Sequence, residues 1–332
     1  MLWEKLSNIN ERMKKQISGF LRSISGILIA LVFLYFTFRN KPLNDIIHSI
    51  VEANFYWLFL SGVCLFILTF LRSLRWKILI DNAGYTAKTS NVFLSLLIGY
   101  FVNSFTPKFG EIVRCTTLQK SDGVPVSKNL GTVVSERIYD VIVLGLGIIF
   151  IFLAEADKLY NLFSRVFENM NGFEGFQRML ILLTIIGIVG IAILIYVRKK
   201  EFKNQIIKKI ADFINDMVTT ILQTFKIKRF PYFIILTVLI WFVLVVMNFF
   251  FLKSLPITDN YNLMFAVVVL FVGGIGWALP APGGIGTTHF FILQLFIAYN
   301  LSETAGLSFG ILSNGITLIL TVFFGLVAWI IW

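Results

Sequence analysis

The sequence predicts an all-α polytopic membrane protein. Hydrophobic residues make up 57% of the 332 positions and charged residues only 14%, whereas an ordinary soluble domain has about 25% charged residues. The chain also contains several apolar stretches of about 18 residues or more, the length that a helix needs to cross a bilayer. No stretch is polar enough for long enough to form a separate soluble domain. We therefore expect residues 1–332 to form a single integral membrane domain.

Apolar segments run through most of the chain. They lie at 20–38, 55–71, 91–106, 138–154, 179–197, 231–251, 261–279, 287–299 and 306–332. The first of them is expected to remain as an anchor, because its polar lead is long and no small-x-small cleavage site follows it. That lead, residues 1–19, is basic and is predicted to be a cytoplasmic tail. The cysteines Cys64 and Cys115 have no metal-binding spacing, and we expect both to be buried filler.

The charges of the loops predict the orientation of the segments, because basic loops face the cytoplasm. The 198–230 segment is strongly basic and is placed inside, whereas the balanced 155–178 loop is placed outside. If 91–106 crossed the membrane fully, the basic stretch 107–136 would lie outside. A re-entrant hairpin over 91–119, which enters and leaves on the cytoplasmic side, removes this conflict.

A second re-entrant hairpin is predicted over 261–299, entering from outside, with LPAPGGIGTTH at its tip. The order of span, hairpin and span then occurs twice with opposite orientation, which is typical of the inverted repeats of transporters. This interpretation gives about six full spans and two hairpins. The alternative is eight or nine plain spans with a tolerated charge mismatch.

Residues 201–225, within the basic 198–230 segment, repeat apolar side chains at the period of a helix. The pattern predicts an amphipathic helix at the cytoplasmic interface. It would act as a gate or lipid sensor or, as the favoured alternative, as a passive linker.

Polar residues gather around the first hairpin, and ionisable residues inside a membrane mark functional sites by default. The candidate substrate-binding residues here are Asn103, Pro107, Gly110, Glu111, Arg114, Glu136, Arg137 and Asp140. On a helix, Glu111 would share a face with Arg114, and Glu136 with Asp140. The alternative is that these charges only neutralise one another. Arg72 and Arg75, at the end of a span, are expected to be snorkelling cytoplasmic anchors.

The second tip differs in its chemistry. Its candidate substrate-binding residues are Pro280, Pro282, Gly283, Gly284, Gly286 and His289. The glycines are expected to offer free backbone amides beside a helix that starts at Thr287, which would make an anion site. The alternative for the glycines is a tight turn or a helix crossing. His289 would donate or shuttle a proton or, as an equal alternative, be a satisfied buried histidine.

Three stretches resemble the flippase-like transmembrane family, which includes the membrane half of lysylphosphatidylglycerol synthases. They are LRSLRWKILI, then NSFTPKFGEIVRCTTLQ followed by SERIYD, and finally LPAPGGIGTTH. The matches keep their order over most of the chain. The family often has an acidic residue where this chain has His289, so a carboxylate role is not carried over. The sequence ends at Trp332 without the soluble aminoacyl-transferring domain, and lysyl transfer by this chain alone is not expected.

The resemblance implies a transporter or flippase that moves an anionic or headgroup-modified lipid between leaflets, either a phospholipid or a polyprenyl-phosphate-linked sugar. Arg114, Arg137 and the glycine amides would bind phosphate, while Glu111 would balance them or contact a cationic headgroup. The expected partners are membrane lipids. Despite the net charge of +11, nucleic acid is not expected, because basic loops suit anionic lipid. No cofactor or metal is expected, and the location is the plasma membrane with a cytoplasmic N-terminus.

Two alternatives from other classes stay open. The first is a membrane glycosyltransferase, or another lipid-headgroup transferase with a lipid-phosphate donor, in which Glu155 and Asp157 would ligate a divalent metal. The second is a membrane scaffold for a separate transferase partner.

Overall fold

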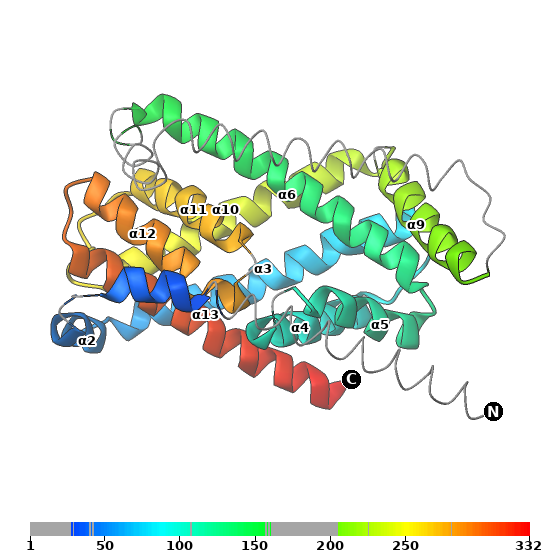
Figure 1. Ribbon diagram of the computed structural model, residues 1–332, viewed down its shortest axis with the longest axis horizontal. Helices are drawn as coiled ribbons and strands as arrows, with labels where there is room; N and C mark the ends of the chain where they lie inside the picture. The colour runs from blue at the N-terminus through cyan, green and yellow to red at the C-terminus, as the bar shows by residue number, and fades with distance from the viewer. Residues whose placement is uncertain are drawn as a thin grey trace.

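A computed structural model describes residues 28, 30–39, 41, 43–106, 108–156, 158, 160, 205–224, 226–279 and 281–332. Helices and their connecting turns make up these ranges, and no strand occurs among them (Figure 1). The all-α prediction is therefore confirmed. The predicted span 179–197 and part of the span 20–38 lie outside the described residues, although residues 30–38 are helical.

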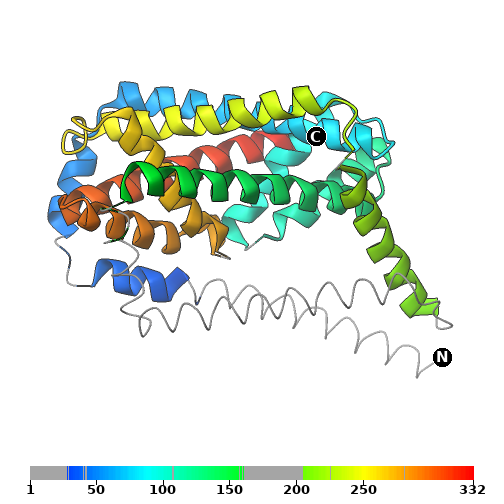
Figure 2. The ribbon, with the colours of Figure 1, turned by 90° about the horizontal axis from the view of Figure 1, so that it is seen from above.

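Among the described residues, four helices are long and apolar enough to cross a membrane. They are α3 (Phe55–Asn82), α6 (Val126–Ala154), α10 (Phe230–Ser254) and α13 (Glu303–Ile331). The shortest, α10, has 25 residues and is about 37 Å long, which exceeds the ~30 Å of the hydrocarbon core. α3 and α10 lie side by side along one edge of the bundle (Figure 2). The prediction of a polytopic membrane protein is therefore confirmed.

Two pairs of shorter helices separate these long helices. Between α3 and α6 lie α4 (Thr89–Phe105) and α5 (Gly110–Asp122). Between α10 and α13 lie α11 (Leu263–Ala278), the 3-10 turn η1 (Pro282–Gly284) and α12 (Thr287–Ala298). In each pair the second helix packs back against the first. The predicted order of long helix, hairpin and long helix thus occurs twice, while the depth of the hairpins in a membrane stays a prediction.

Each hairpin closes where a glycine removes the side chain at the crossing. A Cβ on Gly110 would lie 1.9 Å from the carbonyl oxygen of Gly99, so the backbones of α4 and α5 are in direct contact. A Cβ on Gly276 of α11 would lie 2.6 Å from the Cα of Thr288 on α12. In membranes such small residues allow helices to approach closely, and here they allow two short helices to fold as one unit.

The open end of the first hairpin is tied by Asp122. Its carboxylate accepts hydrogen bonds from the backbone N–H of Lys88 (2.9 Å) and from Asn91 Nδ2 (3.0 Å). Burial raises the pKa of Asp122, but these bonds and one from Ser121 outweigh it and hold the pKa below its ordinary value. The start of α4 and the end of α5 therefore stay together.

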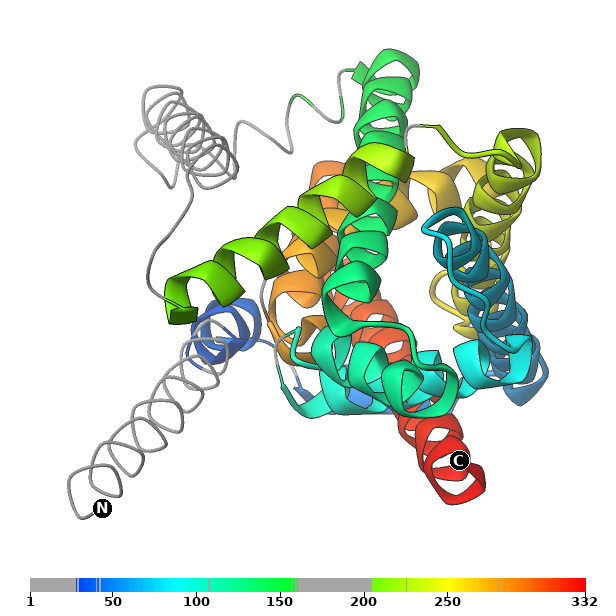
Figure 3. The ribbon, with the colours of Figure 1, turned by 90° about the vertical axis from the view of Figure 1, so that its right-hand side faces the viewer.

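Besides the helical residues 30–38, the described chain has two further helices, namely α2 (Leu43–Val51) and α9 (Gln205–Thr224). α9 crosses the first part of α6, the end that is predicted to face the cytoplasm (Figure 3). A Cβ on Gly131 of α6 would lie 2.7 Å from the Cβ of Thr220, and Lys128 pairs with Asp216 at 2.7 Å. The helix predicted over 201–225 is confirmed for the described residues, and its packing on α6 gives it fixed contacts with the bundle. Its placement at the cytoplasmic interface stays a prediction.

Apolar side chains fill two main cores. The larger lies among α3, α10, α11, α12 and α13, and it contains Cys64. The smaller lies where α3, α4, α5 and α6 meet, and it contains Cys115 and Trp76. Both cysteines are free and buried, as predicted.

Replacement of Gly110 by alanine should destabilise the protein by about 1–3 kcal/mol or more, because the new methyl group would overlap backbone that cannot rotate away. The matched control is Gly145→Ala on α6, where a Cβ meets nothing within 4 Å and the better helix former should leave stability unchanged or raise it by up to about 1 kcal/mol. Thermal unfolding of the two purified variants measures both effects. Equal stability of the two would show that the α4–α5 contact is not close.

Candidate functional site

Three arginines and three carboxylates from α3, α5 and α6 form a closed ring of alternating charge. The contacts around this charge ring are Arg75 to Glu136 (3.1 Å) and Asp140 (2.7 Å), Arg114 to Glu136 (3.1 Å) and Glu111 (2.6 Å), and Arg137 to Glu111 (2.8 Å) and Asp140 (3.6 Å). Each charge therefore has two partners of opposite sign. The contacts fit the alternative in which these charges neutralise one another, and the ring adds Arg75 to them. A role of these residues in substrate binding stays a prediction.

The charge ring passes from the interior to the surface. The side chains of Arg75, Arg114 and Glu136 are 0%, 1% and 1% exposed. Arg137 is 41% exposed, and Glu111 and Asp140 lie between these extremes. A buried charge is costly unless it is paired and hydrogen-bonded. The double pairing compensates the buried members, while Arg137 remains open to a ligand.

Aromatic residues hold the buried arginines in place. Trp76 Nε1 donates to Thr132 Oγ1 at 2.9 Å, which fixes the indole between α3 and α6. The Arg114 guanidinium lies 4.6 Å from the centre of the Trp76 ring, within the range of a cation–π contact. The position of Arg114 therefore depends on an aromatic face as well as on two carboxylates.

Two more cations stand beside the charge ring. Arg72 Nη1 donates to Tyr100 Oη at 3.1 Å, and Lys108 Nζ donates to the carbonyl oxygen of Trp277 at 3.3 Å. Neither makes an ion pair with a carboxylate of the described residues. The cluster of Arg72, Lys108 and the ring thus has five cations against three carboxylates, a surplus of two positive charges. Such a surplus favours an anionic ligand.

The first hairpin tip is built by Asn103 and contacts the second hairpin through Lys108. Asn103 Oδ1 accepts from the backbone N–H of Gly110 at 2.7 Å, which satisfies an amide at the start of α5. Lys108 has a φ of 61°, a left-handed conformation that is uncommon for a residue other than glycine. This turn places its ammonium on Trp277, and η1 packs against α4 (Figure 1). The two predicted tips are therefore neighbours.

Three backbone amides of the second tip are already used within the turn. Those of Gly284, Ile285 and Gly286 donate to Ala281 O (3.2 Å), Pro282 O (3.0 Å) and His289 Nδ1 (3.3 Å). The expectation that the glycine loop offers free amides is therefore wrong for these three, because the positive φ angles of Gly283, Gly284 and Gly286 close a tight turn. A headgroup contact by Pro282 or these glycines stays a prediction, and free amides at these positions no longer support it.

His289 caps the helix that follows this turn. α12 begins at Thr287, as predicted, and the His289 side chain is buried with Nδ1 accepting from the Gly286 amide. In this bond Nδ1 carries no proton. The contact fits the alternative of a satisfied buried histidine, and a proton-shuttle role stays a prediction.

Arg75 is the site residue that sequence reasoning misplaced. The expectation of a snorkelling anchor is wrong, because Arg75 is completely buried between Glu136 and Asp140. Arg72 bonds to Tyr100 of α4 rather than extending to an interface. One sequence signal for this position was available. Glu136 and Asp140 are four residues apart and share a helix face, so a cation from another helix could pair with both carboxylates.

Three residues of the sequence hypotheses, Pro107, Asp157 and Pro280, lie outside the described residues. Glu155, the other carboxylate of the metal hypothesis, pairs with Lys158 at 2.9 Å.

Comparison with known proteins identifies the family. Residues 23–325 match the model of the lysylphosphatidylglycerol synthase TM region. The chain belongs to this family. The matched range covers both hairpins and the charge ring of this family member, and it relates the chain to lipid handling in a membrane.

Two similar proteins are archaeal. The UPF0104 membrane protein MJ1595 of Methanocaldococcus jannaschii is 27% identical, over 92% of this chain and 93% of the relative. The UPF0104 membrane protein PH1989 of Pyrococcus horikoshii is 24% identical, over 87% of this chain and 90% of the relative. Both match the membrane region over nearly their full length, so the likeness does not depend on a short motif.

Replacement of Arg75 by glutamine should destabilise this family member by about 3–5 kcal/mol, because Glu136 and Asp140 would lose a buried partner. The control is Lys77→Gln on the same helix, whose surface pair with Asp81 contributes about 0–1 kcal/mol. Thermal unfolding in detergent measures both.

A second substitution, Asp140→Asn, should restore part of the stability that Arg75→Gln removes, because without Arg75 the Asp140 carboxylate keeps only its longer contact, to Arg137 at 3.6 Å. If Arg75→Gln lowered the free energy of unfolding by no more than Lys77→Gln does, the ring would not be important for stability.

Proposed function

We propose that this protein moves a phosphate-bearing lipid between membrane leaflets and binds the headgroup at the exposed edge of the charge ring. The observation that carries the proposal is the surplus of two positive charges around a ring that reaches the surface at Arg137. Family membership supports it, because the family relates the chain to lipid handling. The anionic, phosphate-bearing partner is the chemistry that this surplus would attract.

Apolar side chains are exposed at the first hairpin tip, the segment that also carries Lys108 and Glu111. Phe105, Phe109 and Ile112, at and beside the first hairpin tip, are 60%, 53% and 41% exposed. A lipid has a charged headgroup joined to apolar chains, and this edge presents charge and exposed apolar surface side by side. The headgroup would meet Arg137 and Lys108 while the chains remain against these apolar side chains.

Binding would proceed by exchange of ion-pair partners. Arg137 Nη2 donates to Glu111 at 2.8 Å, and phosphate oxygens would take the place of this carboxylate. A guanidinium binds phosphate through two parallel hydrogen bonds, so the exchange replaces one anion by another and leaves no charge unpaired. Lys108, whose ammonium donates to the carbonyl oxygen of Trp277 and pairs with no carboxylate of the described residues, would add a second donor.

Movement of the bound headgroup would use the repeated architecture. Each half of the described chain has a hairpin between two long helices, and the hairpins touch at Lys108 and Trp277. In transporters built from inverted repeats, one repeat rocks against the other around a site at the repeat interface. A headgroup at the edge beside both tips would be exposed to one side and then to the other.

Arg137→Gln should slow movement of an acyl-labelled anionic phospholipid in proteoliposomes by about tenfold or more, since a charge-assisted hydrogen bond contributes about 1.5–3 kcal/mol. The matched control is Lys208→Gln, an exposed cation on α9, which should behave as the wild type. Reduction of the fluorescent label by external dithionite measures the movement.

The same assay with an acyl-labelled diacylglycerol, which has no phosphate, provides the specificity arm. The wild-type protein should not increase the rate at which the diacylglycerol moves between leaflets. Equal rates for wild type and Arg137→Gln on the phospholipid would contradict headgroup binding at this edge.

A further inference from the structure

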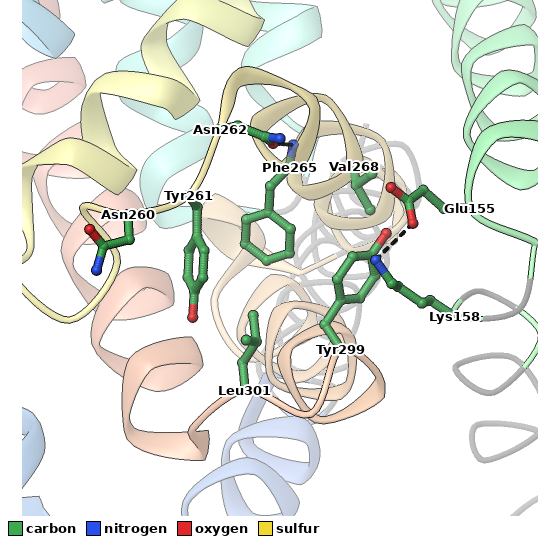
Figure 4. Close-up of a pocket in the computed structure, with 9 residues that line it drawn as sticks. All are labelled: Glu155, Lys158, Asn260, Tyr261, Asn262, Phe265, Val268, Tyr299 and Leu301. Atoms are coloured by element: carbon green, nitrogen blue, oxygen red, sulfur yellow. Dashed lines mark hydrogen bonds and ion pairs between the residues drawn. The ribbon is translucent and has the colours of Figure 1, made fainter.

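A cavity of about 310 Å³ lies at the opposite end of α6 from the charge ring. Its walls come from the end of α6, the turn between α10 and α11, the first part of α11 and the end of α12 (Figure 4). Its lining includes three aromatic rings, two asparagines and one pair of opposite charges. The volume is at the lower end of the range of small-ligand sites, about 300–1,000 Å³. This size suits one headgroup rather than a whole lipid.

The cavity and the charge ring are separate sites. Glu136 of the ring and Ala154, the last residue of α6, are 18 residues apart on one helix, which is about 27 Å along its axis. The hydrocarbon core of a bilayer is ~30 Å thick. A ligand in the cavity would therefore lie near the membrane face opposite to the ring.

One wall of the cavity is aromatic. The ring centres of Tyr261 and Phe265 are 4.7 Å apart, and those of Phe265 and Tyr299 are 5.2 Å apart. Figure 4 shows the three rings in a row. Aromatic walls with a few placed polar groups are typical of small-ligand sites, and the C–H faces of sugars and of glycerol pack well against such rings.

The charges in the cavity are already paired. Lys158 Nζ lies 2.9 Å from Glu155 and 4.6 Å from the centre of the Tyr299 ring. The ammonium thus occupies the carboxylate and the aromatic face that a cationic ligand would need, and the pair has no net charge. The charge ring has a surplus of positive charge, whereas this pair is neutral. The neutral pair disfavours both an anionic and a cationic ligand.

Uncharged polar groups remain for a ligand. The hydroxyl of Tyr299 is buried, and no described residue hydrogen-bonds to it. The side-chain oxygen of Asn262 accepts from the amide of Phe265 at 3.0 Å, and its NH₂ group has no hydrogen-bond partner among the described residues. Asn260 adds a second amide to the lining. A buried hydroxyl without a partner is costly, and a ligand hydroxyl would satisfy it.

We propose that this cavity binds an uncharged polyhydroxyl group, a sugar or a glycerol unit, at the membrane face opposite to the charge ring. The rings of Tyr261, Phe265 and Tyr299 pack against its C–H surface. The Tyr299 hydroxyl and the two asparagine amides bond to its hydroxyls. The inference concerns binding alone and holds whether or not the charge ring moves lipids.

The test measures equilibrium binding to the full chain in phosphatidylcholine nanodiscs, with signals from empty nanodiscs subtracted. The probe is monomeric octyl glucoside, observed by saturation-transfer NMR. Tyr299→Phe removes only the hydroxyl and should weaken binding about fivefold, the effect of one hydrogen bond. The matched control is Tyr56→Phe, an exposed tyrosine at the start of α3, which should bind as the wild type does.

Two further arms define the ligand. Octyl phosphate and octyltrimethylammonium carry the same chain with a charged headgroup and should bind more weakly than the glucoside. Methyl glucoside, which lacks the chain, distinguishes a free sugar from a lipid headgroup as the source. A preference for either charged headgroup, no specific binding of the glucosides, or equal binding by Tyr299→Phe and Tyr56→Phe would overturn the proposal.

Discussion

The pairing of buried arginines with carboxylates is the constraint on which the fold around the site depends. Arg75 and Arg114 are almost fully buried in an apolar helical bundle, where an unpaired charge is not tolerated. These arginines and their partners come from three helices, so the charges are compensated only when α3, α5 and α6 hold one arrangement. α5 is a short helix without a span of its own, and it reaches this position only because the chain reverses at the first hairpin tip. The glycine contact between Gly99 and Gly110 is therefore a condition for the ring as well as for the hairpin.

The sequence predicted the architecture well because its strongest signals are local. Apolar length specifies a spanning helix, and the glycine and proline clusters mark where the short helices break. The close agreement of the predicted 261–299 hairpin with Leu263–Ala298 follows from this. The spacing of Glu111 and Arg114 likewise specified their contact on one helix. Helix ends were less predictable: α6 begins at Val126, twelve residues before the apolar segment at 138, because its polar first part packs on α9 rather than on lipid.

What the sequence left open concerns partners that are distant in the chain. Arg75 and Glu136 are 61 residues apart, and no local pattern distinguishes a buried arginine at the end of a span from one that extends to an interface. The amides of the second tip are a similar case. The glycines made a loop certain, but whether its N–H groups bond within the turn or remain for a ligand depends on the φ angles that the packing selects, and on a histidine side chain that accepts one of them.

The two ends of α6 differ in their chemistry, and the difference constrains the kind of lipid that would use both. The ring end has a surplus of positive charge that suits phosphate, whereas the cavity end has paired charges and uncharged hydrogen-bonding groups that suit hydroxyls. A headgroup with both parts, a phosphate joined to a glycerol or sugar unit, would find a partner for one part at each end. Neither site alone would hold such a headgroup fully, and incomplete binding at each end favours release. A lipid that has to leave each site on its way across requires this balance.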